Sequence, residues 1–197
     1  MAATLSWYNN NPLDIHVKHM KNVLRYLKGT EELWIKYDGS SSAGLIGYSD
    51  SDWGENWDDC HSTSGHVFLM ANGYISWALQ HQKTVALSVG ESEYTELAST
   101  GWQAAWLKSI SRETGFLIHE PIPLCMDNQA VIFLMVNPAV EHQTKHINIW
   151  HHYICEQYEN KVVEPYHIPG EENPADLFMK SLAVIKVEKF RAMIRLM

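Results

Sequence analysis

The chain has 197 residues, 46% of them hydrophobic and 19% charged, which gives it the length and apolar content of one globular domain, with a small appendage at most. No apolar run reaches the length of a bilayer span, and the start MAATLSWYNNNP lacks the basic-then-apolar pattern of a secretory signal, so we expect neither a membrane protein nor a secreted one. The net charge of −8 excludes a broad basic surface for nucleic-acid phosphates and predicts weak affinity for such a substrate from this chain alone.

The first half of the chain shows one helical pattern followed by several extended ones. Asn11-Pro12 has the form of a helix cap followed by proline at the first helical position, and apolar residues recur at helical spacing from Leu13 to Leu27. We therefore expect a helix that stops at Gly29. Strand-like runs follow, the last two joined as a hairpin by the turn at 71–73: LWIKYD (33–38), LIGYSD (45–50), GHVFLM (65–70) and YISWAL (74–79).

The second half alternates helices with short strands. Residues 84–88 (TVALS) are either a further strand or the lead-in to a long helix, which starts near Gly90 and carries a stripe of small residues. VVEPYHI (162–168) contains Pro165, which cannot donate a hydrogen bond to a neighbouring strand, so we expect an edge strand there. The remaining expected elements are a strand at 121–126 and helices at 128–136, 147–158, from Asn173-Pro174 onward, and 186–197.

Four acidic residues lie in four separate segments of this pattern. Asp50 and Asp127 close strand-like runs, whereas Glu93 and Asp176 lie on helix-like stretches. Carboxylates so far apart in sequence can converge at one edge of a sheet and hold two divalent cations, of which one activates water and the other stabilises the leaving oxygen of a phosphodiester. Oxygen-only ligands favour Mg²⁺, with Mn²⁺ as a substitute. The order strand-Asp, helix-Glu, strand-Asp, helix-Asp predicts a ribonuclease H.

Several longer motifs carry a family resemblance. NVLRYLKGT (22–30) is similar to the end of a reverse transcriptase, and five further stretches follow in family order over roughly residues 45–182: GYSDSDWGENWDDCHSTSGHVF, ISWALQHQKTVALSVGESEYTELA, CMDNQAV, TKHINIWHHYI and ENPADLFMKSL. The chain thus resembles the ribonuclease H region of Copia-type (Pseudoviridae) LTR-retrotransposon polyproteins. Residues 1–43 would then be a remnant of the C-terminal (connection) region of reverse transcriptase, 44–182 the ribonuclease H domain and 183–197 a C-terminal helical tail.

The resemblance implies a mixed five-stranded sheet flanked by helices, and cleavage of RNA paired to DNA. The four acidic residues match the family's metal ligands, which hold two Mg²⁺ about 4 Å apart. The products would carry a 5′-phosphate and a 3′-hydroxyl, and contacts to 2′-hydroxyl groups would discriminate RNA from DNA. The expected partners are the RNA–DNA hybrid and reverse transcriptase, in a cytoplasmic virus-like particle or in the nucleus. Candidate phosphate contacts, each also readable as an ordinary surface lysine, are Lys83, Lys145 and Lys180.

Two other aspartates compete for the role of Asp50. Tyr37-Asp38-Gly39-Ser40 looks like the first-strand motif of cellular and retroviral ribonucleases H, but starting there would leave LIGYSD as a surplus strand before the glutamate helix. We therefore favour Asp50. Asp52 would share the face of Asp50 if the strand continued, and could bind metal through water, although a solvated loop start is the simpler interpretation.

The chain departs from the family pattern at positions that are not metal ligands. The family usually has a basic pair where Cys60-His61 stands, and threonines where Gly90 and Met179 stand. The lost basic pair further weakens the expected grip on substrate, and it supports a rival hypothesis: a catalytically silent, repurposed module that acts through protein or nucleic-acid binding. An integrase-like transferase is disfavoured because it needs a glutamate where Asp176 stands.

Other residue types suggest sites that we interpret structurally. The histidine pairs at 142/146 and 151/152 lack the Cys pairs of a structural zinc site, so we expect no zinc. His167 precedes Asp176 as a product-release histidine would, but it lies in a strand-like run, so we predict a structural role. The three cysteines are expected to be reduced thiols. Four tryptophans are expected in the core rather than as stacking platforms for bases: Trp77, Trp102, Trp106 and Trp150.

Overall fold

The computed structural model describes residues 5–6, 8–40, 44–53, 61–116, 118–137, 148–179 and 182–197. These form two compact units, Met1–Trp34 with Met197, and Ile35–Leu196. Several positions interpreted from the sequence lie outside the described residues: Cys60, His142, Lys145, His146 and Lys180. None of the helices in the described part of the chain is long and apolar enough to cross a bilayer.

The N-terminal unit is built on helix α2 (Asp14–Gly29), which ends at Gly29 as predicted. Its start is two residues later than the Asn11-Pro12 cap predicted, because Leu13 is the cap residue and its backbone N–H donates to His16 Nδ1 at 3.1 Å. No described residue of α2 is buried, although apolar residues recur along it. The helix therefore carries an apolar stripe without a covering layer of its own.

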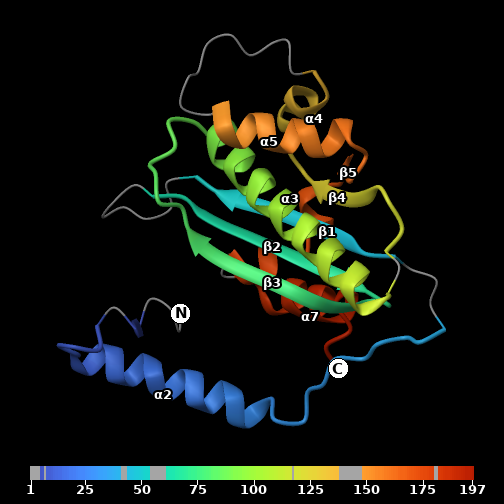
Figure 1. Cartoon of the computed structure of the whole chain (residues 1–197). Coiled ribbons are helices and arrows are strands. Elements are labelled where there is room, and N and C mark those ends of the chain that lie inside the picture. Colours follow the sequence, from blue (N-terminus) through green and yellow to red (C-terminus); the bar gives the residue numbers. More distant parts are fainter. Residues whose placement is uncertain are drawn as a thin grey trace. The chain divides into compact units, whose positions relative to one another are not determined.

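The larger unit contains one five-stranded sheet in the order β3-β2-β1-β4-β5 (Figure 1). Its strands are β1 (Ile46–Asp52), β2 (Thr63–Met70), β3 (Gly73–His81), β4 (Ile122–Met126) and β5 (Val163–His167). The pairs β1–β2 and β2–β3 are antiparallel, whereas β1–β4 and β4–β5 are parallel. This is the predicted mixed sheet, with β5 at an edge as its proline required.

Turn chemistry explains the hairpin. Ala71 and Asn72, between β2 and β3, both have positive φ, 50° and 61°, which is the backbone of a two-residue turn matched to the twist of the strands. Gly73 then allows close approach, because a Cβ there would lie 2.7 Å from the ring of Tyr37. Tyr37 lies in the stretch 33–38 that was predicted as a strand, and this prediction is wrong. The stretch makes the isolated bridge Ile35–Leu196, and Asp38 N–H donates to the Ala71 backbone oxygen at 2.9 Å, but it is not a strand of the sheet.

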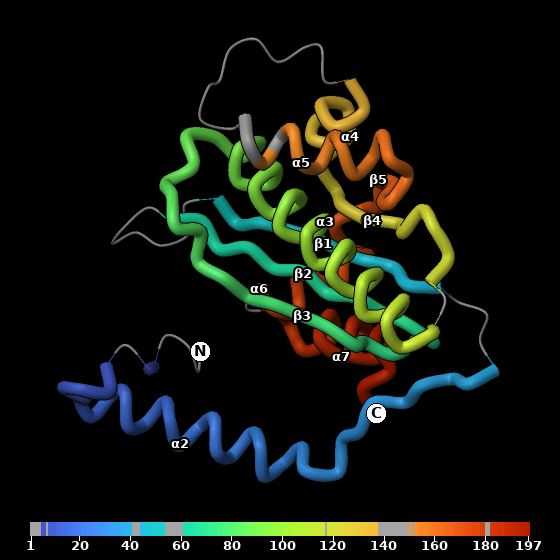
Figure 2. The backbone as a smooth tube through the Cα atoms, in the orientation of Figure 1, coloured from blue at the N-terminus to red at the C-terminus, as the bar shows by residue number. Residues whose placement is uncertain are grey.

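Helices cover both faces of the sheet (Figure 2). The helix α3 (Val89–Thr114) lies on one face, flanked by α4 (Gln129–Val136) and α5 (Asn148–Glu159). The short helix α6 (Asp176–Met179) and the helix α7 (Val184–Met193) lie on the other. Residues 84–88 are not a strand but lead into α3, where Ser88 caps the helix by accepting from the Glu91 backbone N–H at 3.2 Å.

The sheet separates two apolar clusters. The larger lies between the sheet and α3, α4 and α5, and includes Phe68, Leu97 and Ile154. Close packing there explains the stripe of small residues on α3, because a Cβ at Gly101 would collide with Ile154. The smaller cluster joins Val67 and Leu69 of β2 to Ile194, so the C-terminal segment packs on the sheet.

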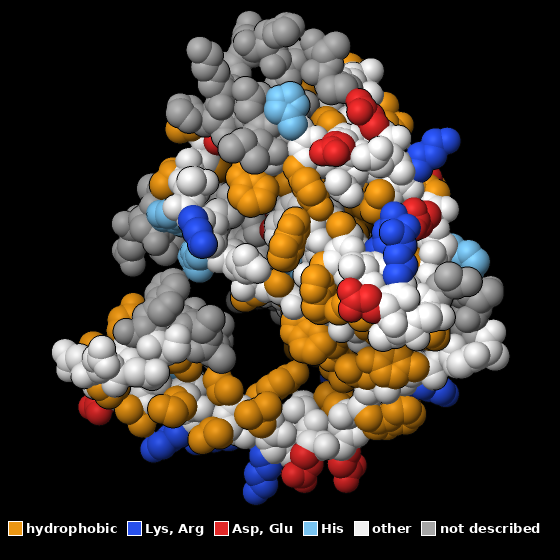
Figure 3. All heavy atoms as spheres, viewed as in Figure 1, with side chains coloured by type: hydrophobic (Ala, Val, Ile, Leu, Met, Phe, Trp, Pro, Cys, Tyr) orange, Lys and Arg blue, Asp and Glu red, His pale blue; other side chains and the backbone are white. Residues whose placement is uncertain are grey.

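The tryptophan prediction is wrong. Trp77, Trp102, Trp106 and Trp150 are 48–60% exposed, so none belongs to the core. On α3, the indoles at positions 102 and 106 lie one turn apart on a helix whose buried contacts are made by smaller residues such as Ala98 and Ala104. Figure 3 shows hydrophobic side chains gathered on the outer surface over α3.

Candidate metal centre

Two neighbouring strands place the first two carboxylates side by side. In the parallel pair β1–β4, Tyr48 is opposite Cys125. Asp50 lies two residues after Tyr48, within β1. Asp127 lies two residues after Cys125, directly after β4. Parallel strands end at the same edge of a sheet, so this register brings two carboxylates of distant sequence positions together.

The first turns of α3 supply the third carboxylate. Ser88 fixes the start of the helix, and Glu93 follows in its second turn. One carboxylate oxygen from each of Asp50, Glu93 and Asp127 lies within 4.8 Å of the other two. Asp50 is 3% exposed and the other two are half-buried. Three converging anions in a partly buried position are costly without a compensating positive charge.

This donor set fits a hard divalent cation. An Mg²⁺ ion binds oxygen at about 2.1 Å, so two ligands on opposite sides of one ion lie about 4.2 Å apart. The three carboxylate oxygens lie within 4.8 Å of one another, which is close to this distance between two ligands of one ion. Within the described residues the group contains carboxylates alone, the ligand chemistry that Mg²⁺ and Mn²⁺ accept.

Asp176 is placed near this edge but outside that group of three. It is the first residue of α6 and is 6% exposed. The turn before it is tied to β1, because Asn173 Nδ2 donates to the Ser49 backbone oxygen at 2.8 Å and Asn173 Oδ1 accepts from the Ala175 N–H. The Asn173-Pro174 start thus anchors α6 beside the strand that carries Asp50. A ligand role for Asp176 stays a prediction.

An open cavity of about 470 Å³ borders two of the three carboxylates, Glu93 and Asp127. Asn128 caps α4 by accepting from the N–H groups of Ala130 and Val131, and the neighbouring Gln129 also faces the cavity. Neither residue is among the site residues predicted from the sequence, although both directly follow Asp127. The cavity is lined by Glu93, Asp127, Asn128, Gln129, Ala130 and His167.

His167 is the last residue of β5, and its Nε2 lies 3.1 Å from the backbone oxygen of Asp127. This contact holds β5 against the end of β4, which agrees with a structural role. The same side chain also lines the cavity beside two of the carboxylates. The imidazole is therefore within the site as well as part of its framework.

Asp38 is held by its own loop. Hydrogen bonds from the Ser40 side chain and backbone N–H lower the pKa of the Asp38 carboxyl. The residue precedes β1 and is absent from the group of converging carboxylates, which contains Asp50 instead. Asp52 ends β1 half-buried and is likewise outside that group, and Lys83 is exposed.

Gly170 makes room for the Asp127 carboxylate. A Cβ at this position would lie 2.7 Å from Asp127 Oδ2, closer than van der Waals contact permits. We expect Gly170→Ala to displace that carboxylate and to weaken Mn²⁺ binding about tenfold, as perturbed support of a metal ligand usually does. Isothermal titration with Mn²⁺ measures this. Gly44→Ala, where no atom lies within 4 Å of the new Cβ, is the control, and equal affinity of the two variants would contradict the prediction.

Comparison with solved structures identifies the fold. The crystal structure of LC11-RNase H1 in complex with RNA/DNA hybrid superposes with a TM-score of 0.51, covering 68% of this chain and 92% of that one at 17% identity. No protein-family model matches the chain. The mixed sheet with flanking helices is the ribonuclease H fold, and its edge carries an acidic triad.

Sequence relatives place the chain more narrowly. It is 34% identical over 187 residues to the retrovirus-related Pol polyprotein from transposon RE2 of Arabidopsis thaliana, and 35% identical over 187 residues to that from transposon TNT 1-94 of Nicotiana tabacum. These matches cover 94% and 95% of this chain but 13% and 14% of the polyproteins. The chain belongs to the family of Copia-type retrovirus-related Pol polyproteins, of which it spans about one seventh of the length.

A further relative has a different name. Secreted RxLR effector protein 161 of Plasmopara viticola is 38% identical over 113 residues, which cover 57% of this chain and 80% of that protein. Sequence of this kind therefore makes up most of a protein that is not named as a polyprotein.

Proposed function

We propose that this chain is a metal-dependent endonuclease that hydrolyses the RNA strand of RNA–DNA hybrids. The observation that carries the proposal is the convergence of Asp50, Glu93 and Asp127 at one edge of a ribonuclease H fold. Membership of the Pol polyprotein family supports it, because reverse transcription leaves RNA paired to new DNA. The solved relative of this fold was crystallised with an RNA/DNA hybrid, which supports the same substrate class.

The proposed ligands are the three converging carboxylates with Asp176 as a fourth, holding two Mg²⁺ or, as a substitute, Mn²⁺. When bound, the ions supply charge neutralisation at the phosphodiester and lower the pKa of water. The chain itself orients the ligands: the Ser51 backbone N–H donates to Asp50 Oδ1 at 2.9 Å, and the capped start of α3 fixes Glu93. Hydrolysis with these groups leaves a 5′-phosphate and a 3′-hydroxyl.

We propose that three lysines contact substrate phosphates. Lys83 is exposed, whereas Lys145 and Lys180 lie outside the described residues. Asn128 and Gln129 line the cavity next to Asp127 and have amide groups suited to hydrogen bonds with sugar hydroxyls. Selection of RNA over DNA requires such contacts, because the 2′-hydroxyl is what distinguishes the two.

Cleavage of a labelled RNA–DNA hybrid in Mg²⁺ or Mn²⁺ tests the proposal, with a DNA duplex of the same sequence as the control. We expect cuts in the RNA strand alone, ending in 3′-hydroxyls. A folded protein that cuts neither duplex with either metal, with or without added reverse transcriptase, would contradict the proposed function.

We expect activity to fall steeply with salt and to be feeble without added reverse transcriptase. The net charge of −8 predicts weak affinity for the hybrid, so the protein is far from saturated with substrate and each loss of affinity that added salt causes lowers the cleavage rate directly. The measurement is initial cleavage rate at about 0.05 and about 0.2 M KCl, with and without the polymerase. Brisk cleavage by the isolated chain at the higher concentration would contradict this prediction.

A second candidate is a catalytically silent module that acts by binding. The observation that favours it is the effector protein of Plasmopara viticola, most of which matches this chain outside any polyprotein. An Asp50→Asn variant separates the two functions. A biological effect of the protein that survives this substitution unchanged would support the module, and one that is lost would support the nuclease.

A further inference from the structure

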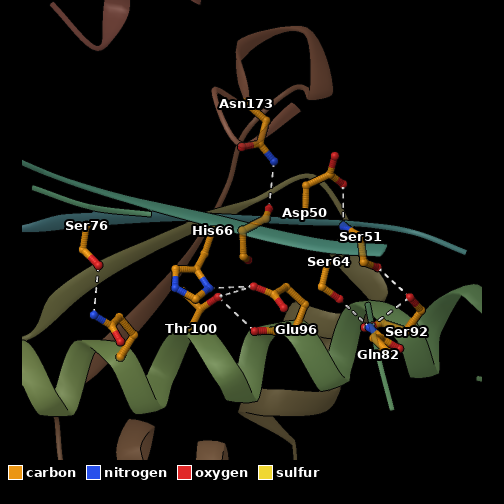
Figure 4. Close-up of polar contacts among 12 residues, drawn as sticks. Asp50, Ser51, Ser64, His66, Ser76, Gln82, Ser92, Glu96, Thr100 and Asn173 are labelled. Carbon is orange, nitrogen blue, oxygen red and sulfur yellow. Dashed lines mark hydrogen bonds and ion pairs between the residues drawn. The ribbon is translucent and has the colours of Figure 1, made fainter. Parts of the chain in front are cut away.

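A buried polar cluster lies behind the candidate metal centre (Figure 4). It is formed by Ser51 of β1, Ser64 of β2, Ser92 of α3 and Gln82, which follows β3. All four are 0–7% exposed. Buried polar side chains continue along α3, where His66, Glu96 and Thr100 are 0–4% exposed, whereas Phe68 and Leu97 belong to the apolar part of the same interface. The cluster is the part of this polar layer that adjoins the carboxylates in sequence, since Ser51 follows Asp50 and Ser92 precedes Glu93.

Gln82 is the centre of this cluster. Its Nε2 donates to Ser64 Oγ at 2.6 Å and to the backbone oxygen of Ser92 at 2.8 Å, and lies 3.3 Å from Ser92 Oγ. The contact with a backbone carbonyl, which can only accept, fixes the amide orientation. The backbone of Gln82 is also held in place, because the Gln82 N–H donates to the Ser62 backbone oxygen at 2.9 Å. One side chain thus joins β2 to the start of α3.

The cluster continues to the first metal-ligand candidate. Ser92 Oγ donates to Ser51 Oγ at 3.0 Å, and the Ser51 backbone N–H donates to Asp50 Oδ1 at 2.9 Å. Ser92 and Ser51 each adjoin a residue of the acidic triad, Glu93 and Asp50 respectively. Side chains alternate across a strand, so Ser51 faces α3 while Asp50 points to the opposite side. The hydrogen bonds therefore connect the backbones that carry two ligands.

We propose that Gln82 is a positioning residue of the metal centre, which sets the spacing between Asp50 and Glu93 through Ser92 and Ser51. The proposal rests on the function proposed above, in that it takes the acidic triad as a cation site. The three converging carboxylates repel one another before a cation arrives, so contacts between the elements that carry them must oppose this repulsion. Hydrogen bonds between buried groups are electrostatically stronger than exposed ones, so the bonds of Gln82 Nε2 oppose this repulsion, although Gln82 Oε1 is buried with no hydrogen-bond partner among the described residues.

The test compares Gln82→Met with Gln103→Met. Both replace a glutamine by an apolar side chain of similar length, and Gln103 makes the same kind of helix-to-strand contact, Nε2 to Ser76 Oγ at 2.9 Å, away from the carboxylates. Calorimetric titration with Mn²⁺, without nucleic acid, measures affinity, and thermal melts measure folding. We expect Gln82→Met to weaken Mn²⁺ binding by about tenfold to a hundredfold, and Gln103→Met to leave it unchanged.

Equal Mn²⁺ affinity in the two variants, or a loss matched in both, would overturn the proposal. If Gln82→Met does not fold, Ser92→Ala replaces it, because this variant keeps the backbone contact to Gln82 and removes the hydrogen bond to Ser51. Ser92→Ala should also weaken Mn²⁺ binding. Unchanged affinity would overturn the proposal. Where both variants fold, their combination should be less than additive, because they interrupt one network.

The outcomes also separate this inference from the proposed nuclease. The wild-type protein could bind Mn²⁺, lose this binding in Asp127→Asn, and still never cleave a hybrid. That result would contradict the proposed nuclease activity, and the Gln82→Met titration would still test the positioning role. Wild-type protein that binds no Mn²⁺ at this centre would overturn the positioning role itself.

Discussion

Replacing Asp127 with asparagine should slow the cleavage of an RNA–DNA hybrid by roughly a thousandfold. The substitution removes one of three converging carboxylates and its charge while keeping the side-chain shape. Metal-supplied charge stabilisation is worth several kcal/mol, and each 1.36 kcal/mol is tenfold in rate, so losing about 4 kcal/mol gives that factor. Initial rates on a labelled hybrid, in Mg²⁺ and in Mn²⁺, measure the effect.

Asp38→Asn is the matched control for this experiment. It makes the same chemical change at the aspartate whose sequence motif competes with Asp50 but whose carboxyl is bound by Ser40. Activity should stay at the wild-type level. Loss of cleavage in Asp38→Asn with normal activity in Asp127→Asn would show that the catalytic carboxylates had been assigned to the wrong strand.

His66→Leu should destabilise the fold by about 1–3 kcal/mol, because it leaves the buried Glu96 carboxyl without the hydrogen-bond partner that His66 supplies. His66 Nδ1 lies 2.9 Å from Glu96 Oε1, and both side chains are 5% exposed. Thr100 adds a weaker contact at 3.3 Å that would remain. Urea unfolding gives the free energy, and Lys108→Met, which breaks the more exposed ion pair with Glu120, should cost less than about 1 kcal/mol.

The loss in His66→Leu should depend on pH with a defined sign. Burial raises the pKa of the Glu96 carboxyl, and the hydrogen bond and charge of His66 oppose that rise. Without His66 the pKa rises further, so the folded state keeps a proton that the unfolded chain releases above its value of 4.5. The folded state then binds more protons, and stability falls as pH rises through this window. We expect a smaller loss at pH 5 than at pH 8; an equal loss at both would contradict this origin.

The sequence was sufficient to predict the parts of the site that local patterns encode. Asp50 and Asp127 end apolar runs, and Glu93 lies near the start of a long helix, so each could be assigned to an element. Their convergence followed from the family resemblance, because no local pattern states that β1 pairs in parallel with β4. Gln82 was not identified, since a glutamine after a strand looks like an exposed polar residue until the fold encloses it.

The errors have physical causes of the same kind. The run at 33–38 has the composition of a strand, but it does not pair with the edge strand β3. It forms the isolated bridge Ile35–Leu196 instead. The tryptophans at helical spacing looked like core residues because periodicity identifies a face but not which face is covered. On α3 the small residues Ala98, Gly101 and Ala104 take the covered side, where α5 approaches too closely for an indole.

The strand order also sets when the acidic triad can exist during synthesis. The meander β1–β2–β3 joins neighbours in sequence through short connections, so it can form early, whereas the β1–β4 pairing must wait for a long stretch of chain. When the meander and α3 have left the ribosome, the nascent chain contains Asp50 and Glu93 but not yet Asp127. Cation affinity should therefore appear late in translation, as the parallel half of the sheet closes, and nascent chains that stop before β4 should have the early scaffold without the capacity to bind metal.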